Sequence, residues 1–167
     1  MEIVIAAPRY VLWLVLGLDA AVVASALLKK GKFVSRLLGL GVVAVVSVFL
    51  LVLVFRPSRL SVGGEAMLDA TYFRTITVPL RSISAAFVVP SFAKSDYRPT
   101  IKTNGNALPG IKSGWFKLAN GRTAKVLIQS SPDALVLETA DTLWVLAPDR
   151  LGELVAALRE RGVTVRE

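Results

Sequence analysis

The stretch "GIKSGWFKLANGRTAKVLIQS", residues 110–130, decides the fold of this chain. Two segments rich in apolar, β-branched and aromatic residues flank Asn120-Gly121. An Asn-Gly pair between such segments is the strongest short-range signal for a β-hairpin. We expect a type I′ turn here, because both central residues of that turn need positive φ. Residues 110–118 and 122–130 therefore predict two adjacent antiparallel strands.

Turn residues divide the neighbouring sequence into further short strands. Gly63-Gly64, Pro79, Pro90, Asn104-Gly105 and Ala140-Asp141 mark the breaks. The strand segments between them are "RLSV" (59–62), "YFRTITV" (72–78), "SISAAFVV" (82–89), "RPTIKT" (98–103), "ALVLET" (134–139) and "TLWVLA" (142–147). About seven short strands at such intervals predict an antiparallel barrel or sandwich.

The hydrophobic period changes once, after Pro148. Leu151, Leu154, Val155 and Leu158 follow the i, i+3, i+4, i+7 spacing of an amphipathic helix. Gly162 is a typical residue just beyond a helix end. We therefore expect a C-terminal helix over about 148–161. The following "VTVRE", residues 163–167, is either a short tail or a last pairing strand.

The first third of the chain holds most of the apolar excess, in a sequence that is 54% hydrophobic with mean hydropathy +0.61. Residues 10–28 contain one charge, Asp19, and residues 37–55 contain none. At about 1.5 Å per residue each run reaches roughly 28 Å, close to a hydrocarbon core of about 30 Å. We expect two transmembrane helices, about 10–28 and 37–55, which make residues 1–56 a membrane anchor and leave 57–167 as a separate domain.

The connector between these runs, residues 29–36, is strongly basic. It carries Lys29, Lys30, Lys32 and Arg36. Positive charge favours the cytoplasmic side of a membrane. The expected localisation is therefore a multi-pass cell-membrane protein with loop 29–36 in the cytoplasm and an extracytoplasmic C-terminal domain.

Four segments resemble the bacterial and archaeal PH (pleckstrin-homology-like) domain family. They are "ITVPLRSIS" (76–84), "TNGNALPGIKSGWFKLANGRTAKVLI" (103–128), "VLET" (136–139) and "LAPDRLGELVAAL" (146–158). The resemblance implies a PH-like β-barrel capped by a C-terminal α-helix, preceded by a two-helix transmembrane hairpin. It implies no defined ligand and no catalytic residues.

Basic residues gather in the middle of the predicted barrel, in a chain with a net charge of +8. Seven of them and one acid, Asp96, lie between Lys94 and Lys125. These residues could face anionic lipid or a protein partner, or they could be outward lysines that protect strand edges from pairing. The candidate surface comprises Lys102, Lys112, Trp115, Lys117, Arg122 and Lys125.

Asp19 is the notable polar residue of the first apolar run. A carboxylate within a membrane span is costly and is often functional. It could line an ion path or contact a membrane subunit, or it could pack against a polar group such as Ser47. Gly17, Ala21 and Ser25 recur at a spacing of four, which permits close helix approach. The candidate intramembrane contact is therefore Gly17, Asp19, Ala21 and Ser25.

Cysteine and histidine are both absent, which excludes disulfides, thiolate and imidazole metal ligands, and catalysis by either residue. The glycines at 105, 110, 114 and 121 match no phosphate-binding fingerprint, because no strand-to-helix transition follows them. We expect no catalytic site, metal, cofactor, nucleic acid or small-molecule substrate. The predicted function is a non-enzymatic, membrane-anchored interaction module that binds a protein partner or forms a homo-oligomer. The alternatives are a sensor of anionic lipid surfaces, and an accessory subunit of a transporter or membrane protease.

Overall fold

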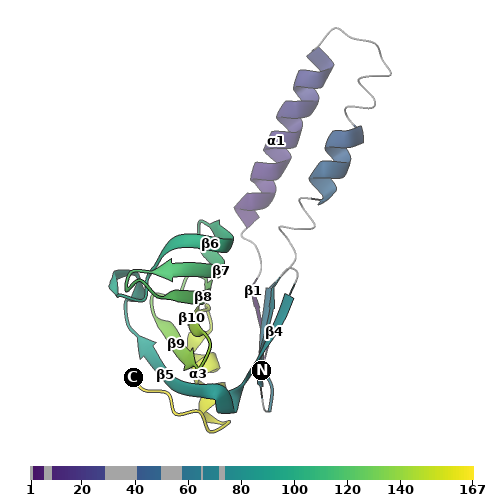
Figure 1. The fold of residues 1–167 in the computed structure, drawn as a ribbon. Coiled ribbons are helices and arrows are strands. Elements are labelled where there is room, and N and C mark those ends of the chain that lie inside the picture. Colours follow the sequence, from purple (N-terminus) through teal and green to yellow (C-terminus); the bar gives the residue numbers. More distant parts are fainter. Residues whose placement is uncertain (1, 6–8, 29–40, 50–57, 65, 72–73) are drawn as a thin grey trace. The chain divides into compact units, whose positions relative to one another are not determined.

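The computed structural model describes residues 2–5, 9–28, 41–49, 58–64, 66–71 and 74–167 (Figure 1). The chain forms two compact units. The β unit comprises Met1–Ile5 and Ser58–Glu167, and the helical unit comprises Ala6–Pro57. The first residues of the chain therefore belong to the β unit, and the helical unit is an insertion into it.

A four-stranded antiparallel sheet forms the first part of the β unit. Its strand order is β1-β2-β3-β4. The strands are β1 (Glu2–Ile5), β2 (Ser58–Val62), β3 (Ala66–Thr71) and β4 (Arg74–Pro79). β1 and β3 were not among the expected strands. β1 has only four residues and pairs with a strand far away in the sequence, where Ile5 lies opposite Ser58.

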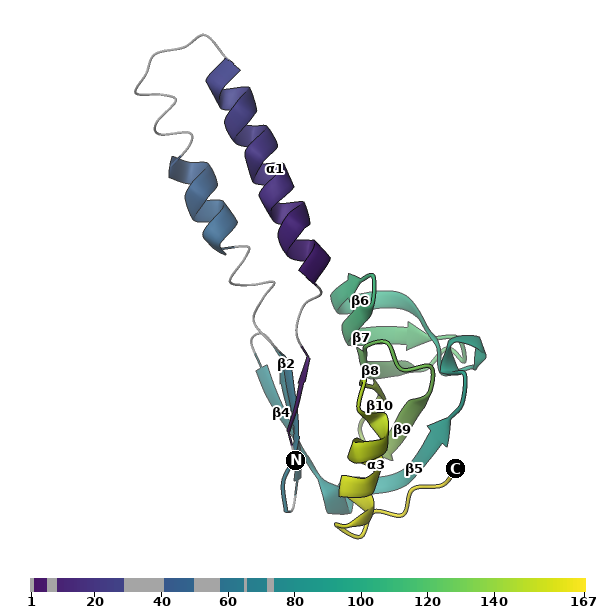
Figure 2. The ribbon, with the colours of Figure 1, turned by 180° about the vertical axis from the view of Figure 1, so that it is seen from behind.

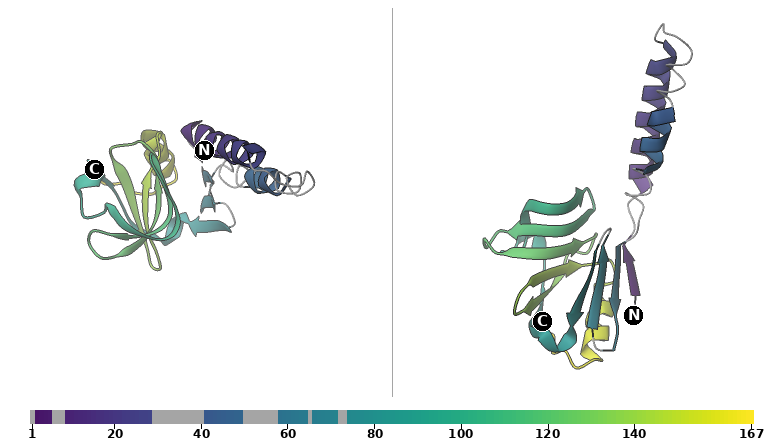
Figure 3. Two further views of the ribbon diagram at one scale, coloured as in Figure 1. Left: turned by 90° about the horizontal axis from the view of Figure 1, so that it is seen from above. Right: turned by 45° about the vertical axis from the view of Figure 1, so that its right-hand side comes forward.

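A six-stranded sheet forms the second part, in the order β5-β9-β10-β8-β7-β6. Figure 3 shows that this sheet is strongly curved. Two short 3-10 turns, η1 (Leu80–Ser82) and η2 (Phe92–Lys94), flank its first strand. The strands are β5 (Ile83–Val89), β6 (Pro99–Leu108), β7 (Ile111–Leu118), β8 (Thr123–Ile128), β9 (Ala134–Thr139) and β10 (Leu143–Ala147).

The expectation of about seven strands, all antiparallel, is wrong. The described part of the chain has ten strands, and β10 pairs with β8 in parallel. β9 pairs with β5 and β10, so the place beside β8 is left to β10. Parallel strands are usually covered on both faces. β10 is buried at every position, and β8 is buried at every position except Thr123.

Two hydrophobic clusters occupy the two faces of this sheet. The first joins Leu127, Leu137 and Leu146 to residues of the four-stranded sheet and of α3 (Leu151–Arg159). The second joins Phe116, Val126 and Val145 to Phe92 of η2. Figure 2 shows α3 against one face of the sheet. The C-terminal helix is confirmed but is shorter than expected. It begins after Arg150 and is followed by Gly162 at φ +82°.

The β7–β8 hairpin is confirmed, but its turn differs from the expected type I′. Gly121 has φ +82°, whereas Asn120 is not among the described residues with positive φ. The Gly121 N–H donates to the Leu118 carbonyl at 3.0 Å, and the Leu118 N–H donates to the Arg122 carbonyl at 2.8 Å. This is the pattern of a type I turn followed by a left-handed glycine bulge. Only one position of the turn therefore requires glycine.

The helical unit contains α1 (Arg9–Leu28) and a second helix described over residues 41–49. Ser47 Oγ donates a hydrogen bond to Asp19 Oδ1 between these two helices. The expected interaction between Asp19 and Ser47 is therefore present. Large apolar side chains of both helices are exposed, including Trp13, Val45 and Phe49.

The predictions of a two-helix transmembrane anchor and of a multi-pass membrane localisation are wrong. Among the described residues, no helix combines the length and the apolar character needed to cross a membrane. The described part of the second helix, residues 41–49, rises only about 14 Å at 1.5 Å per residue. The predicted basic loop 29–36 and the ends of the predicted second span lie outside the described residues.

Candidate functional site: a groove between strand β5 and helix α3

β5 is an end strand of the six-stranded sheet, and its outer edge is occupied by the chain itself. The Val88 N–H donates to the Arg166 carbonyl at 2.8 Å, and the Arg166 N–H donates to the Ala86 carbonyl at 3.0 Å. The two bonds form an isolated parallel bridge between Phe87 and Arg166. Of the two alternatives for "VTVRE", a short tail or a last pairing strand, the structure shows pairing with β5 at Arg166 alone. Residues Val163–Glu167 are called the edge segment below.

Helix α3 holds the edge segment from the other side. Arg159 Nη2 donates to the Val165 carbonyl at 3.1 Å and to Glu167 Oε1 at 2.8 Å. Val165 is buried in the first hydrophobic cluster, and Val163 packs against that cluster. The Val163 N–H also donates to the Leu158 carbonyl at 3.1 Å. The segment is thus bound by two main-chain bonds to β5, one main-chain bond to α3, two packed valines and one arginine.

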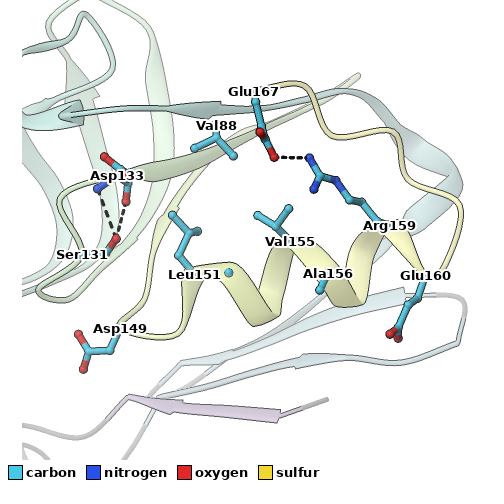
Figure 4. Close-up of a pocket in the computed structure, with 11 residues that line it drawn as sticks. Val88, Ser131, Asp133, Asp149, Leu151, Val155, Ala156, Arg159, Glu160 and Glu167 are labelled. Carbon is cyan, nitrogen blue, oxygen red and sulfur yellow. Dashed lines mark hydrogen bonds and ion pairs between the residues drawn. The ribbon is translucent and has the colours of Figure 1, made fainter.

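A groove of about 620 Å³ lies beside this segment (Figure 4). Figure 4 shows Glu167 and Arg159 together, Val88 facing Leu151 and Val155 of the helix, and Ser131 with Asp133 on the opposite side from Arg159. Arg159 is the one cation among the residues that line the groove. The complete lining is Val88, Ser131, Asp133, Asp149, Leu151, Gly152, Val155, Ala156, Arg159, Glu160 and Glu167.

Two acids of the groove rim are engaged in local hydrogen bonds. Asp133 Oδ1 accepts from the Ser91 N–H at 2.9 Å, and Asp149 Oδ1 accepts from the Ser130 N–H at 3.2 Å. These bonds join the β8–β9 loop to the residues that follow β5 and β10. Beyond the rim, at the start of α3, Arg150 Nε donates to Glu153 Oε1 at 2.6 Å. This hydrogen bond and the attraction of the carboxylate raise the pKa of Arg150.

The predicted basic surface is not gathered in one place. Residues that are directly opposite in a sheet share a face. Lys102 is opposite Phe116 and Lys112 is opposite Ile128, and both of these partners belong to the second cluster. Lys117 is two residues from Trp115 and Lys125 is opposite Trp115, so these two basic residues lie on the other face. None of them lines the groove.

The individual candidates also differ in exposure. Lys102 and Lys117 are exposed, Lys112 and Trp115 are half-buried, and Lys125 is 5% exposed. Lys125 lies in register between Trp115 of β7 and Trp144 of β10. Arg122 is exposed, and its Nη1 forms an ion pair with Glu138 Oε1 at 2.6 Å.

The candidates of α1 lie in the other unit. Gly17, Ala21 and Ser25 are exposed, and Ser25 Oγ donates to the Val22 carbonyl at 2.8 Å. Asp19 is half-buried and accepts the hydrogen bond from Ser47. The predicted intramembrane contact of these residues depends on a membrane-spanning helix, and none is found among the described residues.

Sequence reasoning missed the residues that form the groove. Val88, Leu151 and Val155 were predicted only as strand and helix residues, and Arg159 was not singled out. The available signal was the alternation of Val163 and Val165 with polar residues, which is typical of a half-buried strand. The described residues contain no group of metal-ligating side chains.

One comparison with known proteins identifies the family. A family model described as a bacterial PH domain matches residues 64–162, from within the β2–β3 connection through α3. The match excludes the helical unit and ends directly before the edge segment. No curated protein matches the chain. The match spans more than half of the sequence, and the chain belongs to the bacterial PH-domain family.

Proposed function

We propose that this bacterial PH domain is an interaction module that binds an extended segment of a partner protein in the groove between β5 and α3. The observation that carries the proposal is the pair of main-chain bonds from Arg166 to Val88 and Ala86. Addition of a strand to a sheet edge gives affinity through main-chain hydrogen bonds, and pockets for alternate side chains give specificity. The outer edge of β5 already accepts such a strand.

The groove beside this edge has the properties of a peptide site. Its volume of about 620 Å³ lies within the range of common ligand pockets, roughly 300–1,000 Å³. Val88, Leu151 and Val155 supply an apolar wall, while Arg159 and four carboxylates supply charge at the rim. A partner segment would displace the edge segment and extend further along β5.

The other predicted functions have less support. A lipid surface would need its basic side chains on one face, but the strand register divides them between two faces. A subunit contact through Asp19 would compete with the hydrogen bond from Ser47. A catalytic role for the groove lacks a free nucleophile, because its one hydroxyl, that of Ser131, donates to the Asp133 carbonyl at 2.9 Å. The proposed function is therefore non-enzymatic.

Selection from a random peptide library displayed on phage, with the full chain immobilised, tests the proposal. Enriched peptides should lose at least tenfold in affinity for Val88→Pro, and less for Val88→Ala, which loses part of the apolar wall but keeps the main-chain donor. Proline lacks the N–H that now reaches Arg166, and it is tolerated on edge strands. Alanine keeps the N–H and removes more of the side chain, so it is the matched control.

Two results would contradict the proposal. One is a selection that enriches no peptide. The other is a set of peptides that bind Val88→Pro as tightly as wild type, which would place their site elsewhere on the domain. Circular dichroism of both variants checks that the β unit remains folded.

A further inference from the structure

We infer that the edge segment is a built-in competitor for the groove, and that the groove recognises extended segments with an apolar residue followed two positions later by an acidic one. This inference rests on the proposed function. The pattern is taken from the segment itself, in which Val165 is the buried side chain and Glu167 makes the ion pair. Arg159 is the residue that would select the acid.

The alternation of a strand explains the pattern. Side chains two residues apart point to the same face. Val163, Val165 and Glu167 thus share the face turned toward the domain, and Val165 is 7% exposed. Thr164 and Arg166 are exposed, and Arg166 contributes its main chain to β5. The one position between the two recognised residues is therefore free to vary.

Arg159 provides the discrimination between acidic and other residues. It donates to both the Val165 carbonyl and the Glu167 carboxylate. Its contacts therefore depend on the position of the segment's main chain and on the negative charge of its last residue. It is also the one cation lining the groove, where Asp133, Asp149 and Glu160 would repel an acid placed elsewhere. Charge complementarity therefore fixes the acid to one end of the groove.

The ion pair at the end of the edge segment is weak enough to be exchanged for one with a partner segment. The side chains of Arg159 and Glu167 are 44% and 76% exposed. Exposed ion pairs typically change an equilibrium constant by only about one- to fivefold. A partner segment with the same pattern and additional contacts along β5 could therefore replace the edge segment.

Hydrogen exchange of the full chain tests the first half of the inference. The amides of Val88 and Arg166 depend on the edge segment for their hydrogen bonds. Arg159→Glu and Glu167→Lys each place like charges together, so both amides should exchange about two- to fivefold faster. The double variant Arg159→Glu/Glu167→Lys restores opposite charges and should recover protection. Unchanged exchange in both single variants would overturn the competitor role.

Binding of a labelled peptide with the sequence VTVRE, measured by fluorescence anisotropy, tests the second half. Glu167→Lys should bind it about two- to fivefold more tightly than wild type, because the competing segment is released. Arg159→Glu should prefer VTVRK over VTVRE by a similar factor. The peptide VTVAE is the control for the intervening position and should bind like VTVRE. Equal binding of VTVRE and VTVRK to Arg159→Glu would overturn the recognition pattern.

The two proposals can fail separately. If library peptides require the Val88 N–H but are indifferent to charge reversal at Arg159, the inference fails and the peptide-binding function stands. If they bind Val88→Pro as well as wild type, the proposed function fails too. Amide protection in the double charge variant is measured without any peptide, so its recovery tests the competitor role independently of the library selection.

Discussion

Gly105 of β6 and Gly114 of β7 lie opposite each other, and each occupies the space that a side chain on the other would need. Their φ angles are +126° and +129°. A Cβ on Gly105 would be 2.7 Å from the Gly114 Cα, and a Cβ on Gly114 would be 2.6 Å from the Gly105 Cα. The register of β6 and β7 also shifts just before this pair, between Lys102 and Asn104. The two glycines therefore allow the strands to meet closely at this irregularity.

Replacement of either glycine by alanine should lower the free energy of unfolding by roughly 2–4 kcal/mol. The reason is that both the positive φ and the contact with opposing backbone are unfavourable for a side chain. Urea unfolding followed by tryptophan fluorescence measures the effect. The double variant should be less costly than the sum of the single ones, since the two residues share one contact.

Two other glycines serve as controls for this prediction. Gly110 has φ +81° but open space where a Cβ would lie, so Gly110→Ala should cost only about 1 kcal/mol. Gly152 lies in α3 with open space, and Gly152→Ala should raise stability by up to about 1 kcal/mol. Equal costs at positions 105 and 110 would contradict the importance of the close strand contact.

The β7–β8 turn allows a second prediction. Asn120 Oδ1 accepts from the Arg122 N–H at 3.0 Å, and only Gly121 is left-handed. Asn120→Asp keeps the acceptor and should change stability by less than about 0.5 kcal/mol, whereas Gly121→Ala should cost about 1 kcal/mol. Asn120→Gly should also destabilise, because it removes the acceptor and adds freedom to the unfolded chain. An increase in thermal stability of Asn120→Gly would instead indicate a left-handed Asn120.

The parts of the fold that local sequence determines could be predicted. The hairpin around Asn120-Gly121 depends on a short turn between two alternating segments. Helix α3 depends on Leu151, Leu154, Val155 and Leu158, which form one face. Both elements are stabilised largely by neighbours in the sequence, so the pattern contains the information.

Pairings between distant segments could not be predicted in the same way. The parallel pairing of β8 with β10 depends on β9 joining β5, which no local pattern indicates. Asn104-Gly105 has the composition of a turn but lies inside β6. Glycine is needed at position 105 because a Cβ there would collide with Gly114 of the neighbouring strand, not because the chain turns. The groove requires β5, α3 and the edge segment together, and each contributes residues that are ordinary in isolation.

The ion pair of Arg122 with Glu138 gives a third prediction. Arg122 belongs to the candidate lipid or partner surface, and the structure pairs it within the domain. The two atoms are 2.6 Å apart, and the side chains are 53% and 29% exposed. A double-mutant cycle with Arg122→Ala and Glu138→Ala should give a coupling of about 0.2–1 kcal/mol that decreases in high salt. Lys117→Ala removes the same charge and is the control. A coupling of zero at low salt would show that the pair does not stabilise the fold.

Removal of the helical unit provides the fourth prediction. Ile5 at the end of β1 lies opposite Ser58 at the start of β2, so the insertion leaves and re-enters the β unit at paired positions. Replacement of residues 6–57 by Asn-Gly should therefore close a short β1–β2 hairpin. Shortening the connection should raise the free energy of unfolding by about 1–3 kcal/mol, because less loop-closure entropy is lost. Calorimetry and the protection of the Val88 amide measure the result.

The matched control for this replacement is the fragment 58–167, which lacks β1. Ile3 is 4% exposed and belongs to the first hydrophobic cluster. Loss of this side chain alone should remove about 1.5–3 kcal/mol of stability, and an unpaired edge of β2 would be exposed as well. The hairpin variant should therefore unfold cooperatively at a higher temperature than the fragment. If both unfold at the same temperature, β1 does not stabilise the β unit, and the helical unit is better described as preceding the domain than as inserted into it.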